Sequence, residues 1–229
     1  MKSRYVGRFA PSPTGELHFG SLVAAVASYA DAKSHNGSWL LRIDDIDQPR
    51  SVGGSSESII AALKAFGFQW DGPIRWQSER EHHYQAAIAY LHNQSLTYPC
   101  RCSRRQIEKT ARDGVAGLVY PGTCREWNGA SAEQVAIRML TKNVQVTATD
   151  RIVGDITQNL EADIGDFIIF RADGITAYQL AVVVDDFLDN VTHVVRGADL
   201  VLSTPRQVYL QDKLNYPVLQ YAHVPLVRD

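Results

Sequence analysis

The chain has 229 residues, of which 45% are hydrophobic, and a formal net charge of −2, which suits one large domain or one domain that carries an insertion. This charge excludes a generally basic nucleic-acid coat, so any contact with RNA must come from local patches. No apolar run approaches the roughly 18 residues of a membrane span and no signal-peptide hydrophobic region is present, so we expect a cytoplasmic protein without a membrane partner.

The first part of the chain alternates strand-like and helix-like segments. We predict strands at residues 5–9 and 38–43, and helices that begin near Gly20, cover 56–66 up to Gly67, and run from an S-E-R-E capping box at 78–81 toward Asn93. Alternation of this kind is typical of a parallel α/β sheet.

The character of the sequence changes at about residue 98. Residues 98–165 contain all three cysteines, a basic stretch, Gly-rich turns and a strand candidate at 135–139. We interpret them as a subdomain inserted between two parts of one catalytic domain, 1–97 and 166–229. The first pattern then resumes in segments 166–170, 178–186 and 192–196, and in a helix that S-T-P-R at 203–206 begins, with Pro205 near its first position.

The loop after the first predicted strand is a candidate phosphate site. Its sequence, PSPTG at 11–15, leads into the predicted N-terminus of a helix, where free backbone N–H groups and the helix dipole favour anions. His18 could donate to a phosphate oxygen, and Gly20 would let a flat base approach the backbone. From the spacing alone, a plain loop histidine explains His18 equally well.

Four ordered motifs resemble the glutamate-specific branch of the class I aminoacyl-tRNA synthetases. PSPTGELHFGS at 11–21 resembles the HIGH signature of the class. RIDDID at 42–47 resembles R-I-E-D-T-D, AYQLAVVVDD at 177–186 resembles Y-x-F-A-x-V-V-D-D, and VRGAD at 195–199 resembles I-R-G-E-D. The resemblance spans nearly the whole chain. It implies a Rossmann-type parallel sheet with an inserted zinc-bearing subdomain, and ATP with Mg²⁺ as a substrate.

Two families within this branch are candidates. One is the discriminating glutamyl-tRNA synthetases, which charge tRNA(Glu). The other is the shortened glutamyl-queuosine tRNA(Asp) synthetases, which activate L-glutamate and attach it to the queuosine base in the anticodon of tRNA(Asp). Ile46, Ala198 and the pair Tyr120 and Cys124 are departures toward the second family, which we therefore favour. We expect a monomer that acts on queuosine-containing tRNA(Asp).

The resemblance also implies the residues of the site. Arg8 and Arg196 suit bidentate pairing with a carboxylate, and Asp44 suits the ammonium of glutamate. Ser12 and Tyr178 complete the amino-acid pocket as hydrogen-bonding partners. Asp44 stands where the family commonly has Glu, so it must approach more closely or act through a water. For ATP, the resemblance implies Pro11, His18, Gly20 and Ser21, with His18 as the catalytic donor to phosphate.

The cysteines predict a structural zinc site. Cys100 and Cys102 are one residue apart, and Cys124 adds a third thiolate to the four ligands that Zn²⁺ normally takes. From the residues, Tyr120, Asp113 or His92 could be the fourth ligand, and the family points to Tyr120. The alternative is three unligated thiols with Tyr120 packed among them.

Other conspicuous residues have structural explanations. His82 and His83 are adjacent on a predicted helix and are expected to be solvated, and Asp185 and Asp186 are interpreted as a pair at a strand end rather than a Mg²⁺ site. A solvated helix face explains the basic run better than contacts with RNA phosphates do. It consists of Arg101, Arg104, Arg105, Lys109 and Arg112.

The second signature of the class, K-M-S-K-S or K-L-S-K, normally follows an H-x-P-L segment, which is HVPL at 223–226 here, close to the last residue. We therefore expect that the C-terminal part of the catalytic domain is missing from this sequence, and that the chain binds glutamate but turns it over poorly. A catalytically inactive RNA-binding module stabilised by zinc is the third hypothesis.

Overall fold

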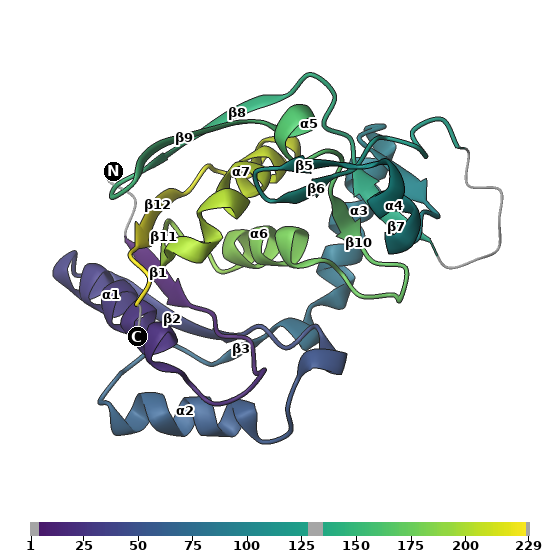
Figure 1. Cartoon of the computed structure of the whole chain (residues 1–229). Helices are drawn as coiled ribbons and strands as arrows, with labels where there is room; N and C mark the ends of the chain where they lie inside the picture. Colours follow the sequence, from purple (N-terminus) through teal and green to yellow (C-terminus); the bar gives the residue numbers. More distant parts are fainter. Residues whose placement is uncertain (1–4, 128–134, 228–229) are drawn as a thin grey trace.

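The structure is a computed structural model that describes residues 5–127 and 135–227. A parallel sheet carries the fold (Figure 1). Its first half pairs β1 (Val6–Phe9) with β2 (Ser38–Ile43) and β2 with β3 (Arg75–Trp76), all parallel. Its second half pairs β11 (His193–Gly197) with β12 (Gln220–Val224), again parallel. The two halves meet where the Thr192 N–H donates to the Val6 carbonyl at 2.9 Å.

Helices cover both faces of this sheet because side chains of each strand alternate between the faces. On β2, Trp39 and Leu41 pack against α1 (Phe19–Ser34) and α2 (Ser55–Ala65). Leu40, between them, faces the opposite core with Val208 of α7 (Thr204–Lys213). A strand buried on both faces is typical of a doubly covered parallel sheet.

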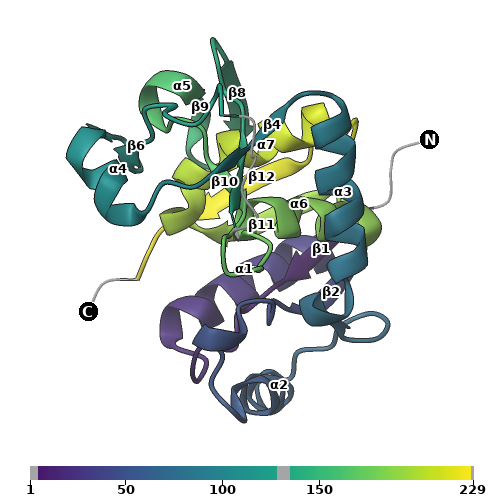
Figure 2. The same cartoon turned by 90° about the vertical axis from the view of Figure 1, so that its right-hand side faces the viewer.

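A second core lies between three helices. It joins α3 (Glu81–Asn93), α6 (Tyr178–Leu188) and α7, with Leu91, Leu180 and Leu210 fully buried. Figure 2 shows α3 standing beside α6. This core fixes α6, which delivers Tyr178 and two buried aspartates to one side of the sheet.

Short antiparallel sheets occupy most of the segment from residue 98 to 165. β7 (Ala136–Met139) pairs with β4 (Thr97–Cys100) and with β10 (Ile168–Phe170), and β5 (Arg112–Gly114) with β6 (Gly117–Val119). These strands and α4 (Arg104–Thr110) stand at one end of the molecule, far from α2 (Figures 1 and 2).

One hairpin returns from this segment to the main sheet. β8 (Gln145–Asp150) and β9 (Gly154–Asn159) are antiparallel, and β8 lies parallel to β12 with Asp150 opposite Tyr221. The short helix α5 (Leu160–Asp163) follows and buries Leu160 in the core of α6 and α7. Segment 98–165 therefore shares both sheet and core with the residues on either side of it.

Two local expectations are wrong. Ser78 does not cap α3, because its N–H and hydroxyl donate to Asp45 at 3.0 and 2.7 Å, and the helix begins at Glu81 without a side-chain cap. Segment 178–186 is the helix α6, so Asp185 and Asp186 lie inside a helix and not at a strand end. The apolar run of 178–186 fits a buried strand and a buried helix equally well, and packing decides between them.

Candidate active site

The candidate glutamate residues gather at the carboxyl ends of the parallel strands. Arg8 lies on β1, Asp44 directly follows β2, and Arg196 lies on β11. All three are buried, with 5 to 6% of each exposed. Tyr178 lies at the first position of α6, and its hydroxyl accepts a hydrogen bond from Nη1 of Arg196 at 3.4 Å. Ligands of open α/β sheets bind at this edge, so the arrangement is that of a ligand site.

A fully buried arginine that the sequence analysis left without a role organises the first half of the site. Arg42 donates from Nε to Oδ1 of Asp44 at 2.7 Å and from Nη1 to Oδ1 of Asp186, also at 2.7 Å. Asp186 in turn accepts from Nε of Arg8 at 3.2 Å. One aspartate therefore joins the two arginines, and Arg42 holds Asp44 in place.

The same network sets the ionisation of the two aspartates. Burial disfavours the charged form of Asp186, but Arg8 and Arg42 outweigh it and hold the pKa of Asp186 below its usual value. For Asp44 burial is the stronger effect, and it raises the pKa of that carboxyl to about 6 although Arg42 opposes the rise. Asp44 is therefore an anion at neutral pH and loses its charge in mild acid.

Arg196 is anchored by a chain of buried polar groups. Nδ1 of His223 lies 2.6 Å from Oδ2 of Asp150, and Nε of Arg196 donates to Nε2 of His223 at 3.0 Å. A carboxylate only accepts, so Nδ1 carries the proton and Nε2 is free to accept from the guanidinium. Burial, and next Arg196, lower the pKa of His223, which keeps the imidazole neutral. Nη2 of Arg196 also donates to Oγ1 of Thr204 at 2.9 Å.

The predicted ATP residues lie together in one loop and one helix start. His18 is the N-cap of α1, where its Nδ1 accepts from the Ser21 N–H at 3.2 Å. A Cβ on Gly20 would lie 3.2 Å from Cε1 of His18, so the close approach that needs a glycine here is that of the His18 ring. The Pro11 carbonyl accepts from the Asp44 N–H at 2.9 Å, which ties this loop to the glutamate residues.

His18 and Ser12 are exposed at this edge and open to a ligand, whereas Pro11 is half-buried. The backbone carbonyl of Ser12 accepts a hydrogen bond from the Thr14 N–H at 2.9 Å and so forms a turn. The loop therefore presents side chains to solvent while its backbone is fixed from both sides.

Asp185 takes no part in a metal site among the residues that the structure describes. Its carboxylate is fully buried and accepts from Gln77, Tyr84 and Arg80 at 2.7 to 3.0 Å. Asp189, one turn on, accepts from Arg75 and Arg80 at 2.9 and 2.8 Å. These ion pairs fasten α6 to the segment before α3.

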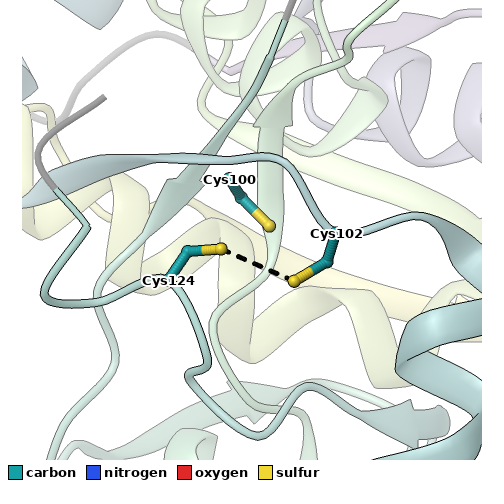
Figure 3. Close-up of side chains that lie close together, drawn as sticks. All are labelled: Cys100, Cys102 and Cys124. Carbon is teal, nitrogen blue, oxygen red and sulfur yellow. Dashed lines mark hydrogen bonds between the residues drawn. The ribbon is translucent and has the colours of Figure 1, made fainter. Parts of the chain in front are cut away.

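The three cysteines form a cluster at the end of β4. Their sulfur atoms lie within 4.8 Å of one another, and Sγ of Cys102 and Cys124 are 3.5 Å apart. Figure 3 shows the three side chains converging on one point. The Tyr120 hydroxyl lies 3.3 Å from Sγ of Cys100 and 3.5 Å from Sγ of Cys102, so all four predicted ligands come together.

This cluster fits a tetrahedral zinc ion. Two thiolates at about 2.3 Å from one tetrahedral ion stand about 3.8 Å apart, close to the separation of Cys102 and Cys124. Within the described ranges the cluster contains no histidine or carboxylate, so neither Asp113 nor His92 belongs to it. Burial is the largest cause that raises the pKa of Cys102 to about 11, and a bound cation would reverse that effect.

The basic run is exposed along its whole length. Arg101, Arg104, Arg105, Lys109 and Arg112 all face solvent. Arg104 pairs with Glu108 one turn later at 3.3 Å, and the Arg101 guanidinium lies 4.9 Å from the Trp127 ring centre. On α3, His82 is exposed and His83 half-buried, with ring centres 3.9 Å apart. These residues make a charged surface, and they lie outside the site at the strand ends.

Comparison with known proteins places this geometry in a family. The model of the catalytic domain of class I tRNA synthetases (E and Q) matches residues 5–229. The glutamyl-Q tRNA(Asp) synthetase of Thiobacillus denitrificans is 52% identical over 224 residues, which cover 97% of this chain and 74% of that protein. Its counterpart in Pseudomonas aeruginosa is 50% identical over 227 residues, or 99% of this chain and 75% of that protein.

Solved structures agree. The glutamate-tRNA synthetase of Elizabethkingia anophelis superposes with a TM-score of 0.84 at 25% identity, over 99% of this chain and 51% of that one. A glutamate tRNA ligase of Elizabethkingia meningosepticum, solved in complex with its amino acid, gives 0.83 at 25% identity, over 98% and 50%. The chain thus spans about half the length of these synthetases.

In the described part of the chain, no helix is both long and apolar enough to cross a membrane.

The resemblance read from the four motifs is confirmed over the whole length of the match. With its class I catalytic fold and its parallel sheet, the chain belongs to the class I tRNA synthetases for glutamate and glutamine, within the family of the glutamyl-Q tRNA(Asp) synthetases.

Proposed function

We propose that the protein activates L-glutamate with ATP and transfers it to the queuosine base of tRNA(Asp). The observation that carries the proposal is the state of Arg8. Its Nε is anchored to Asp186, whereas no acceptor in residues 5–127 and 135–227 bonds to its two Nη atoms. A buried guanidinium with a free pair of donors suits a carboxylate, and Arg196 lies on the neighbouring strand end.

The first step needs positioned charges rather than a protein nucleophile. An α-carboxylate oxygen of glutamate attacks the α-phosphorus of ATP, a new P–O bond forms, and pyrophosphate leaves with the electrons of the broken bond. Arg8 and Arg196 hold the side-chain carboxylate of glutamate, Asp44 receives its ammonium, and Ser12 and Tyr178 add hydrogen bonds. Mg²⁺ bound to ATP would neutralise phosphate charge.

The ATP phosphates would bind at the start of α1. Pro11, His18, Gly20 and Ser21 line this edge, and the helix N-terminus favours anions. His18 acts as the donor to phosphate. Its Nδ1 accepts from the Ser21 N–H, so Nε2 is the ring atom that can donate, and Nε2 would exchange its contact with the Ser21 hydroxyl at 2.9 Å for a phosphate oxygen.

In the second step a hydroxyl of the queuosine base attacks the carbonyl carbon of the glutamyl-adenylate. The ester bond forms, the mixed anhydride breaks, and AMP leaves and takes up the hydroxyl proton. Four residues favour this acceptor over the 3′ end of tRNA(Glu), because each is a departure toward the glutamyl-queuosine family: Ile46, Ala198, Tyr120 and Cys124. The names of the relatives that are about half identical in sequence support the same choice.

The test is acylation of three RNAs with labelled glutamate: tRNA(Asp) with queuosine, tRNA(Asp) without it, and tRNA(Glu). For a protein extended through the second signature, we expect glutamate-dependent ATP–pyrophosphate exchange without any tRNA, and transfer to the first RNA alone, whereas the 229-residue chain should bind glutamate and turn it over poorly. Arg8→Gln and Arg196→Gln should abolish glutamate binding in calorimetry. Charging of tRNA(Glu), or equal charging of both forms of tRNA(Asp), would overturn the assignment.

We also propose that residues 98–165 form an inserted subdomain held by one structural zinc ion between the catalytic parts 1–97 and 166–229. Cys100, Cys102, Tyr120 and Cys124 would be the four ligands, which saturates the ion and leaves no position for a substrate. Elemental analysis should find one zinc per chain, and a Cys100→Ser, Cys124→Ser double variant should contain none. Unchanged zinc in that variant would exclude the site.

A further inference from the structure

A cavity of about 280 Å³ lies next to Tyr178, one of the residues proposed to bind the substrate glutamate. The proposed mechanism gives this cavity no role. Residues of the β5–β6 hairpin, the start of β10 and the first turns of α6 and α7 line it. Two arginines line it, Arg138 of β7 and Arg206 of α7, together with Gln179 of α6 and Leu118 of β6.

Arg138 is 95% buried, since 5% of it is exposed, and it has no carboxylate partner in the described part of the chain. Its Nη1 donates to the backbone carbonyl of Asp166 at 2.6 Å, and its guanidinium lies 3.6 Å from the centre of the Tyr120 ring. Its Nε is buried and makes no hydrogen bond to any residue in 5–127 or 135–227. The Asp166 carboxylate is already engaged by Arg125 at 2.6 Å, so it does not neutralise Arg138.

Arg206 is held even more loosely. Among the described residues, its Nη2 makes two hydrogen bonds, both long, to the Leu202 carbonyl at 3.4 Å and to Oγ of Ser203 at 3.3 Å. Its Nε is buried and has no partner among the same residues. Burial lowers the pKa of Arg206, but a guanidinium stays charged at neutral pH. Arg138 and Arg206 therefore bring two guanidinium groups to a lining that also contains Asp166, whose carboxylate is paired with Arg125. Two cations that pair with no carboxylate in the described part of the chain suit a bound anion.

The position of the cavity says which anion it suits. Gln179 lines it, and the preceding residue on α6, Tyr178, is one of the residues proposed to bind the amino acid. The ATP loop at the start of α1 lies elsewhere, at the ends of β1 and β2. Leu118, 45% exposed, gives the lining an apolar side that a ribose or base can cover. A cavity next to the reacting amino acid is where an RNA acceptor has to enter.

We propose that Arg138 and Arg206 bind a backbone phosphate of the tRNA beside the nucleotide that receives glutamate. This inference rests on the proposed function and deepens it. The two guanidinium groups pair with the phosphate oxygens, and the apolar side of the cavity packs against the attached nucleoside. Inorganic phosphate or pyrophosphate offers the same anion chemistry without a nucleoside, so the experiment has an arm for each source.

The test compares Arg206→Gln and Arg138→Gln with Lys64→Gln, a matched loss of one positive charge on α2, far from the cavity. The probes are queuosine-containing tRNA(Asp), measured by fluorescence anisotropy over a range of salt concentrations, and inorganic pyrophosphate, measured by calorimetry. We expect each arginine variant to weaken tRNA binding about tenfold and to reduce the slope of log Kd against log salt by about 1. Lys64→Gln should change neither the tRNA affinity nor the salt slope. ATP–pyrophosphate exchange in Lys64→Gln should stay at the level of the unmodified protein.

The folding control has a defined sign. Since Arg206 is half-buried and pairs with no carboxylate in the described part of the chain, Arg206→Gln should unfold at the same temperature as the unmodified protein or higher. If Arg138→Gln does not fold, Arg206→Gln carries the test alone.

Each alternative result overturns a different statement. Equal losses in Arg206→Gln and Lys64→Gln, or an unchanged tRNA affinity in Arg206→Gln, refute the phosphate site. A loss of pyrophosphate binding with tRNA binding intact assigns the cavity to a free phosphate and refutes the RNA source. If tRNA binding depends on Arg206 but no glutamate is transferred to tRNA(Asp), the cavity assignment stands and the proposed function fails.

Discussion

Charge at single buried residues controls this site, and Asp44 is the clearest case. Its pKa is about 6 in the folded chain, against an ordinary value of 3.8. Between these two pH values the folded state keeps a proton that the unfolded state has lost. The contribution of Asp44 to stability is therefore full below pH 4 and is lost as the pH rises through 6.

Replacing Asp44 by Asn should remove this dependence. We expect the free energy of unfolding of the unmodified protein to fall relative to that of Asp44→Asn by up to about 3 kcal/mol between pH 4 and pH 6.5. Urea denaturation at several pH values measures it. Parallel curves for the two proteins would mean that Asp44 titrates near its ordinary value.

Asp150 acts on Arg196 through His223, so its variant tests a relay. In Asp150→Asn the side-chain amide donates to Nδ1 of His223, which moves the ring proton to Nε2 and sets two donors, Nε2 and the Arg196 guanidinium, against each other. Glutamate affinity should fall at least about tenfold, the loss of one charge-assisted hydrogen bond, while ATP affinity stays constant.

The matched control for this relay is Asp155→Asn, because Asp155 lies exposed on the neighbouring strand β9. Calorimetric titrations with glutamate and with ATP give the comparison. Equal glutamate affinity in Asp150→Asn and Asp155→Asn would leave Asp150 with a purely structural role.

At the scale of elements, α6 is held by contacts to the carboxylates inside it rather than by a capping side chain at its N-terminus. Ala177 precedes it without a side-chain cap, whereas Asp185 inside it accepts from Tyr84 of α3 at 2.9 and 3.0 Å. Burial, and then the Asp185 charge, raise the pKa of Tyr84, so the phenol stays protonated and keeps donating.

Tyr84→Phe should therefore destabilise the fold by about 1 to 3 kcal/mol, because it removes one donor from a buried carboxylate. Tyr90→Phe on the same helix is the control, since the exposed Tyr90 hydroxyl accepts from Nδ2 of Asn215 and contacts no carboxylate in the described ranges. Chemical denaturation compares the two. The idea fails if both variants lose the same small amount.

The elements also show what sequence patterns can and cannot predict. The strand at 38–43 and the helix at 204–213 follow from β-branched or apolar runs and from a proline near a helix start. Segment 178–186 is ambiguous in sequence because its aliphatic run, residues 180–184, is short enough to fit either a buried strand or a buried helix. Arg42 was passed over although it stands in a quoted motif, since only packing reveals that a charged strand residue is fully buried.

The spacing of Cys100, Cys102 and Cys124 predicts that the three thiols lie together, as they do, whereas Tyr120 beside them was predicted only from the resemblance to the family. The Asp150 and His223 relay had no such signal. Its members are 73 positions apart, on β8 and β12, and only the parallel pairing of those two strands brings them together.

For the whole molecule, the main expectation concerns cooperativity. Met139 and Leu160 of segment 98–165 are fully buried in the same core as Leu180 and Val184 of α6. Removing the segment from the core would leave a large cavity, so the parts should unfold together. We expect one transition in urea, with variants that retain only Trp39 or only Trp127 giving the same midpoint. An earlier transition at Trp127 would indicate that 98–165 unfolds independently.

The burial of Arg42 constrains how this gene can change over generations. A single codon substitution that removed the arginine would strand the charges of Asp44 and Asp186 inside the protein, at a cost of several kcal/mol. A substitution of Asp186 alone would leave part of the charge of Arg8 and Arg42 uncompensated in the same way. Codons 42 and 186 are therefore expected to change together, whereas a neutral isostere at position 44 is open to a single step.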